Sequence, residues 1–136
     1  AQSIELGVTM MKARETALKL KRFEMEERAR KVSDLEQMIR EFENIASDLD
    51  RQIQAEEDRS GVKDPKHFAY STFAKSATQR RDNLRASIGE LRTKLEATQA
   101  DLDDAKQQLA RASTEQPREL GRVRRRHERP AGLALR

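Results

Sequence analysis

The sequence has no cysteine and no tryptophan, and only three prolines and five glycines among its 136 residues. The lack of cysteine excludes disulfides and thiolate metal sites and fits a reducing compartment. No apolar run approaches the ~20 residues that a membrane-spanning helix needs. The opening residues AQSIELGVT contain no basic segment leading into an apolar one, so we expect no secretory signal. These absences predict a soluble, intracellular protein.

Charge is what the chain has in abundance, and it is unevenly placed. Charged residues make up 38% and apolar residues 35% of the chain, a balance that favours long helices or disorder over a large core. Residues 8–32 carry eight basic and four acidic side chains, residues 33–64 four and ten, and residues 65–99 seven and three. The formal net charge of +4 comes from residues 115–136, which hold seven arginines and three glutamates.

Two long segments are nearly free of helix breakers. Residues 8–60 contain neither glycine nor proline, and Gly89 alone interrupts residues 66–116. Apolar residues recur at heptad spacing in both segments, which is typical of a coiled coil. In the first segment the a-type positions are Met11, Leu18, Met25, Val32, Ile39, Ala46 and Ile53, and the d-type positions are Arg14, Lys21, Arg28, Leu35, Phe42 and Leu49. In the second segment the a-type positions are Ala74, Arg81, Ile88, Leu95, Leu102 and Leu109, and the d-type positions are Ala77, Leu84, Leu91, Thr98, Ala105 and Ala112.

The residues between the two segments predict a tight reversal of the chain. Gly61 can end a helix in the left-handed region, and Asp64-Pro65 can begin a short helix near residues 65–70. Ser71 or Thr72 can cap the next long helix. Folding about residue 65 would pair Ala46 with Leu84, Ile39 with Leu91 and Met25 with Ala105. It would also set the acidic block 33–64 against the basic block 65–99.

We therefore predict an all-α fold, a long antiparallel two-helix coiled-coil hairpin with a short helical turn at the tip. The hairpin covers residues 11–113, with helix one at about 8–60, the turn at about 61–71 and helix two at about 72–113. Residues 1–10 form an N-terminal extension, either a non-native remnant or a product of an upstream start codon, and residues 114–136 form a disordered arginine-rich tail. An intermolecular coiled coil is the alternative to the hairpin.

The sequence shows no constellation typical of catalysis. His67 and His127 have no acidic or histidine partners at ligand spacing, and no glycine-rich phosphate loop is present. We expect no enzyme activity, no catalytic residue, no metal and no cofactor.

Interaction surfaces are better candidates, and each has two interpretations. Leu20 and Phe23, off the seam, are either a docking site or incidentally exposed. The cations at positions 14, 21 and 28 either lay their stems over a thin core or form a basic surface for an acidic partner. Three of the five aromatic residues, Phe68, Tyr70 and Phe73, lie within six positions. We expect Phe68 and Phe73 to close the end of the hairpin, while Tyr70 either packs there or meets a partner.

Two segments resemble a known family. MKARETALKLKRFEMEERARKV (11–32) and DRSGVKDPKHFAYSTFAKSATQRRDNL (58–84) are similar to the FliJ family of flagellar type III export proteins, especially its alphaproteobacterial branch. The resemblance covers about Met11 to Ala112. It implies an antiparallel two-helix coiled coil like the stalk of rotary ATPases. It also implies binding to the export ATPase FliI, the export gate protein FlhA and export chaperones.

The resemblance assigns residues to both contacts. The surface facing the ATPase comprises Lys12, Arg14, Lys19, Lys21 and Arg22, and the off-seam pair Leu20 and Phe23 is added to it as a candidate docking site. The surface facing the gate, near the turn, comprises Phe42, Ile45, Leu49, Tyr70 and Phe73. We thus expect a non-enzymatic coupling component for flagellum biogenesis and motility, cytoplasmic and peripheral to the inner-membrane export apparatus, with no specific nucleic-acid partner. The alternatives are a generic coiled-coil adaptor and, third, an arginine-tailed nucleic-acid binder.

Overall fold

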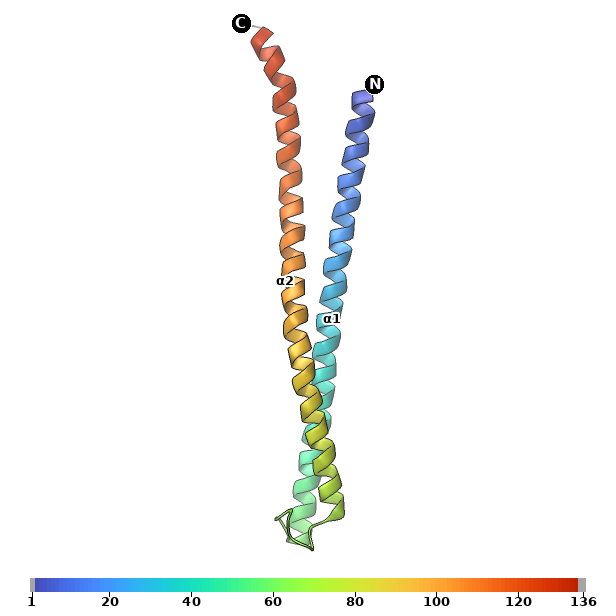
Figure 1. The fold of residues 1–136 in the computed structure, drawn as a ribbon, viewed down its shortest axis with the longest axis vertical. Helices are drawn as coiled ribbons and strands as arrows, with labels where there is room; N and C mark the ends of the chain where they lie inside the picture. The colour runs from blue at the N-terminus through green and yellow to red at the C-terminus, as the bar shows by residue number, and fades with distance from the viewer. Residues whose placement is uncertain (1, 135–136) are drawn as a thin grey trace. The chain divides into compact units, whose positions relative to one another are not determined.

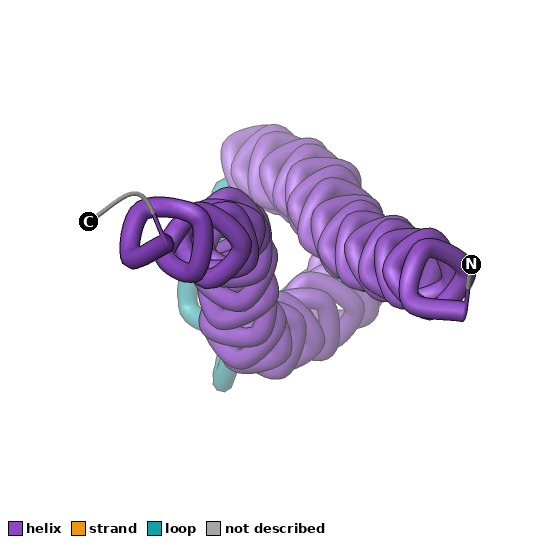
Figure 2. The backbone as a smooth tube through the Cα atoms, turned by 90° about the horizontal axis from the view of Figure 1, so that it is seen from above, coloured by secondary structure: helices purple, strands orange, loops and turns teal. Residues whose placement is uncertain are grey.

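Two long helices make up almost all of the protein. The computed structural model describes the backbone of residues 2–134 and the side chains of residues 2–115. Helix α1 runs from Gln2 to Ser60 and helix α2 from Thr72 to Ala134, and the connecting segment, residues 61–71, joins them (Figure 1). No strand occurs among the described residues, and the tube in Figure 2 is helical on both sides of its teal loop. The predicted all-α fold of two long, packed helices is confirmed.

Both helices are longer at the chain ends than the sequence predicts. Helix α1 begins at Gln2 instead of residue 8, and α2 continues through residues 114–134, for which we expected disorder. Arginine, leucine, glutamate and alanine dominate that stretch, and all four are strong helix formers. The side chains of the arginine tail, including His127, lie outside the described residues.

The chain divides into two compact units. The central unit comprises Arg30–Gln99, and the terminal unit comprises Ala1–Ala29 together with Ala100–Arg136. Each unit takes one stretch from α1 and one from α2, so each contains its own helix-to-helix packing.

The core of the central unit follows the heptad pattern. Leu49, Ile53 and Ala77 form a buried cluster, and Leu84 packs against it. The same unit also buries Val32, Ile39, Ala46, Ala74 and Ile88. Every heptad position of α2 in this unit is buried or half-buried. The apolar stripes therefore face each other and exclude water.

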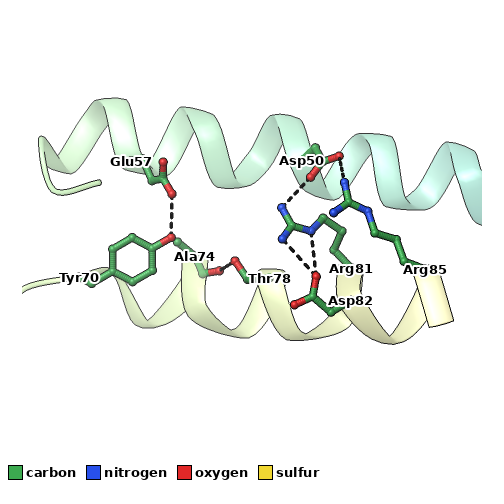
Figure 3. A network of polar contacts seen from close by, with 8 residues as sticks. All are labelled: Asp50, Glu57, Tyr70, Ala74, Thr78, Arg81, Asp82 and Arg85. Carbon is green, nitrogen blue, oxygen red and sulfur yellow. Dashed lines mark hydrogen bonds and ion pairs between the residues drawn. The ribbon is translucent and has the colours of Figure 1, made fainter. Parts of the chain in front are cut away.

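Ion pairs between the helices flank this core. Asp50 accepts hydrogen bonds from Arg81 Nη1 at 2.9 Å and from Arg85 Nη2 at 3.1 Å (Figure 3). Further along, Arg92 Nη2 donates to Glu43 at 2.6 Å. From one pair to the next, the residue in α2 has a higher number and its partner in α1 has a lower one. Each pair joins an acidic residue of block 33–64 to a basic residue of block 65–99, so the predicted attraction between these blocks is confirmed.

The end of α1 is as predicted. Gly61 adopts a φ of 72°, and its N–H donates to Glu57 O at 2.9 Å. Glycine accepts this left-handed conformation without a steric penalty, so Gly61 can end the helix and turn the chain.

The predicted short helix near residues 65–70 is wrong. Two separate turns replace it, closed by His67 N to Asp64 O at 3.0 Å and Tyr70 N to His67 O at 3.1 Å. Ala69 N–H, which a helix would bond to Pro65 O, donates instead to His67 Nδ1 at 3.0 Å. Lys66 N–H donates to Asp64 Oδ1 at 3.0 Å, the bond expected at an N-cap. Such local bonds compete with helix formation.

Ser71 caps α2. Its Oγ accepts the Ala74 N–H at 3.3 Å and its carbonyl accepts the Lys75 N–H at 3.0 Å. This is the arrangement expected of an N-cap serine, and it selects Ser71 over Thr72 as the capping residue.

The terminal unit has a thinner core. Leu102 and Ala105 are buried, whereas Leu18 and Met25 of the facing stripe are only half-buried. Met11, the first predicted seam residue, is 50% exposed. The heptad pattern thus continues into this unit with less apolar surface removed from water.

Candidate partner-binding surfaces

The basic segment, residues 12–23, lies on α1 in the terminal unit. Lys12, Lys19 and Arg22 are exposed, and the cations at the d-type positions 14, 21 and 28 are half-buried. Half-burial agrees with long stems lying over a thin core while their charged ends reach water. The charged end of Arg28 also bonds its own helix, because its Nη1 donates to Glu24 O at 3.1 Å. These cations therefore contribute to packing as well as to surface charge.

Exposed apolar residues gather in the same part of α1. Leu20 is 57% and Phe23 55% exposed, and neither packs in the helix-to-helix core. Among residues 2–115, seven of the eleven exposed large apolar residues belong to the first 23: Ile4, Leu6, Val8, Met10, Met11, Leu20 and Phe23. Single exposed apolar residues are ordinary, but a concentration of them beside cations is typical of a contact surface.

The residues assigned to the gate contact divide by burial. Ile45 is 43% and Phe73 56% exposed, and Phe42 and Tyr70 are half-buried. Leu49 is only 4% exposed and belongs to the core cluster with Ile53 and Ala77. A side chain held there cannot meet a partner without opening the helices, so Leu49 is a core residue. The central unit leaves the other four with some accessible surface.

The aromatic residues of the turn do not pack as predicted. We expected Phe68 and Phe73 to close the end of the hairpin, but Phe68 is 95% and Phe73 56% exposed. Phe73 precedes the buried Ala74 by one residue, which turns it by ~100° away from the core. Phe68 lies on the loop and stacks with His67, with ring centroids 4.6 Å apart.

Tyr70 fills the place expected for the two phenylalanines. It is half-buried, and its hydroxyl donates to Glu57 Oε1 at 2.9 Å (Figure 3). Burial raises the pKa of Tyr70, and the hydrogen bond to the Glu57 carboxylate raises it further. The bond ties the segment preceding α2 to the last turns of α1.

A second bond across the turn joins Ser71 to Glu56. Ser71 Oγ donates to Glu56 Oε1 at 2.9 Å, and Arg59 Nε donates to Glu56 Oε2 at 3.1 Å. The hydrogen bond from Arg59, followed by that from Ser71, lowers the pKa of Glu56. Neither Glu56 nor Glu57 was predicted to take part in the turn, although both lie within one helical turn of Gly61.

The described residues contain no cluster of three or more histidine or acidic side chains that could hold a metal ion. None of the helices in the described part of the chain is long and apolar enough to cross a membrane.

Comparisons with known proteins return nothing: no family model matches the chain, and neither curated proteins nor solved structures give a match.

Proposed function

We propose that the protein is a non-enzymatic coupling component of the flagellar type III export apparatus, similar to FliJ. The observation that carries this proposal is the presence of two separate candidate surfaces on two packed helices. One is the basic, partly apolar segment 12–23, and the other is the group of accessible aromatic and aliphatic residues near the turn. The resemblance of residues 11–32 and 58–84 gives these surfaces their proposed partners.

The proposed architecture is an antiparallel coiled coil. Its support is the burial of a- and d-type positions and the opposite order of the residues paired between α1 and α2. A stalk of this kind presents different side chains along its length, so it can bind two partners through separate segments.

The proposed ATPase contact uses the basic segment. Its members are Lys12, Arg14, Lys19, Leu20, Lys21, Arg22 and Phe23. Cations on such a surface raise the rate of association with an acidic partner and orient it, while Leu20 and Phe23 supply apolar area. The partner in this proposal is the ring of FliI.

The proposed gate contact uses Phe42, Ile45, Tyr70 and Phe73, and leaves out the buried Leu49. Aromatic side chains are common at the centres of protein interfaces because they bury large areas at low entropic cost. The partner in this proposal is FlhA, with export chaperones as additional partners.

The decisive experiment measures ATP hydrolysis by the flagellar ATPase of the same organism with and without this chain. We expect stimulation that is lost when Lys12, Lys19 and Lys21 are changed to glutamate. Circular dichroism would check that the variant remains helical. Absence of both stimulation and co-elution, with a folded chain, would contradict the proposal.

The two contacts are separable in a second experiment. Phe73→Ala combined with Tyr70→Ala should weaken gate binding and spare ATPase binding. Tyr70→Phe is the matched control, because it keeps the ring and removes only the bond to Glu57. Equal loss of both partners in the double variant would count against two separate surfaces.

A generic coiled-coil adaptor is the second candidate, favoured because heptad packing is shared by many adaptors. Flagellar genes beside the gene for this chain would favour the export function.

A nucleic-acid role ranks third, and removal of residues 115–136 would test it through loss of a salt-sensitive affinity.

A further inference from the structure

A second apolar stripe runs along α1 in the terminal unit. Its members are spaced by four, three, four and three residues, and all are exposed: Leu6, Met10, Ala13, Ala17 and Leu20. This spacing is the one by which helices pack against one another over several turns. Nothing in the seam explains it, because the seam uses a different set of residues.

The stripe is displaced from the seam by one position throughout. Met10, Ala17 and Leu20 immediately precede the seam positions 11, 18 and 21. One residue corresponds to ~100° around a helix, so the stripe faces a different direction from the side of α1 that packs on α2. Helix α1 thus has the pattern of a helix with two neighbours, of which α2 is one.

The charges around the stripe indicate what the second neighbour is. Ala13 lies between Lys12 and Arg14, and seven residues later Leu20 lies between Lys19 and Lys21. Residues 10–23 contain five basic side chains and a single acidic one, Glu15. A second copy of the chain would bring the same cations against this segment, which like-charge repulsion disfavours.

A lipid surface fits less well. A helix that lies on a membrane collects its apolar residues on one side. Here Val8 precedes Met10 by two residues and so lies roughly 160° around the helix from it. Val8 is nonetheless 46% exposed, so apolar side chains occur on opposite sides of the segment. Regular four-three spacing with flanking cations favours a helix that carries acidic residues.

We propose that this stripe is a docking seam for an acidic amphipathic helix of a partner protein. Apolar residues of that helix pack on Met10, Ala17 and Leu20, and its acidic residues lie opposite the lysines beside the stripe. The small side chains of Ala13 and Ala17 let the two backbones approach closely. The inference rests on the proposed function only in assigning a partner to this segment; it adds the structural class of that partner.

The test uses a synthetic helical probe peptide with leucines at four-three spacing and glutamates beside them. A second peptide of the same pattern carries lysines instead of the glutamates. Fluorescence anisotropy with the full chain should give an affinity for the acidic peptide at least about tenfold above that for the basic one, the usual scale of an electrostatic preference. Added salt should reduce the difference, because exposed charges are screened.

Substitutions locate the site. Ala17→Asp should weaken binding of the acidic peptide by about tenfold or more, since it places a carboxylate in an apolar contact beside the acidic helix. Val8→Asp is the matched control, because it introduces the same charge on the opposite side of the same segment. It should retain most of the affinity. Circular dichroism would check that both variants keep their helical content.

Several results would overturn the inference. They are equal affinity for the two peptides, equal loss in both variants, dimerisation of the chain abolished by Ala17→Asp, and preferential binding to anionic phosphatidylserine vesicles. Peptide binding without ATPase stimulation would contradict the proposed function and leave this inference standing. ATPase stimulation without peptide binding would contradict this inference and leave the proposed function standing.

Discussion

The central unit and the terminal unit are built from the same two helices. They differ in the side chains that form the core between those helices. The central unit contains eight of the ten buried apolar residues among the described part of the chain, and the terminal unit contains Leu102 and Ala105. In α1 the d-type positions are Leu35, Phe42 and Leu49 in the former, and Arg14, Lys21 and Arg28 in the latter. One heptad pattern therefore supports a well-buried core in one unit and a thin, basic one in the other.

This difference separates stability from recognition. Apolar burial is the largest favourable term in folding, so the central unit can hold the helices together. The terminal unit keeps its cations and apolar side chains accessible, which suits contact with another protein. One prediction compares the two units, and three more test contacts within the central unit.

The largest effect is expected from removing core volume. Leu49→Ala should lower the free energy of unfolding by about 2–4 kcal/mol, because Leu49 is almost fully buried. Leu18→Ala, at a half-buried seam position of the terminal unit, should cost about 1 kcal/mol. Urea denaturation followed by circular dichroism measures both. Equal costs would remove the distinction between the two units.

Two glycines of the central unit should respond with opposite signs. Gly61→Ala should destabilise by about 1 kcal/mol, because alanine disfavours the φ of 72°. Gly89→Ala should stabilise by roughly 0.5–1 kcal/mol, because Gly89 is inside α2 and, apart from its neighbours and the local helix backbone, nothing lies within 4 Å of an added Cβ. The midpoints of urea denaturation measure both changes. A stabilising Gly61→Ala would contradict the role given to this turn.

A smaller effect is expected from the ion pairs between the helices. Asp50→Asn removes the charge that pairs with Arg81 and Arg85 and should cost about 0.5–1 kcal/mol, since these groups are partly exposed. Asp48→Asn is the matched control, because Asp48 pairs with Arg51 of its own helix. The difference between the two variants should shrink in high salt. Equal costs for both would show that the pairs between helices add nothing specific.

The smallest effect concerns the single tyrosine. In the folded chain the pKa of Tyr70 should exceed its ordinary value of ~10, because burial and then Glu57 disfavour the phenolate. A raised pKa means that the protonated Tyr70 stabilises the folded chain. This contribution to stability is fully present below the ordinary pKa and is lost as pH rises through the folded pKa. Near-ultraviolet absorbance follows Tyr70 alone, because the chain has no other tyrosine and no tryptophan.

Glu57→Gln should bring the pKa of Tyr70 closer to its ordinary value without restoring it fully, because burial remains. An unchanged pKa in this variant would show that Glu57 does not act on Tyr70.

Much of the fold was predictable because it depends on local regularities. Heptad spacing identified the buried residues of α2, Gly61 marked the end of α1, and Ser71 and Thr72 were the two candidates for the start of α2. The short helix at 65–70 was not excluded by any pattern, because its loss depends on where His67 places its side chain. Helix propensity was underrated in residues 114–134, where proline and glycine suggested disorder.

The candidate surfaces were predictable only in part. The basic segment and the exposure of Leu20 and Phe23 follow from helical phase, which the sequence contains. That Tyr70 and not Phe68 is half-buried does not follow from helical phase, because it depends on the path of a short loop. An aromatic residue in such a loop can point either way, and hydrogen bonding to Glu57 selects Tyr70.

The order of contacts outward from the turn has a consequence for how the chain folds. Ser71 bonds a residue 15 positions away, Arg81 one 31 away and Arg92 one 49 away. Each doubling of loop length costs only about 0.6 kcal/mol, so every contact makes the next one cheap to form. We therefore expect pairing to begin at the connecting segment and spread outward, with a fast folding rate for a chain of this length. Stopped-flow kinetics should find that Gly61→Ala slows folding, whereas a change in unfolding alone would show that the turn forms late.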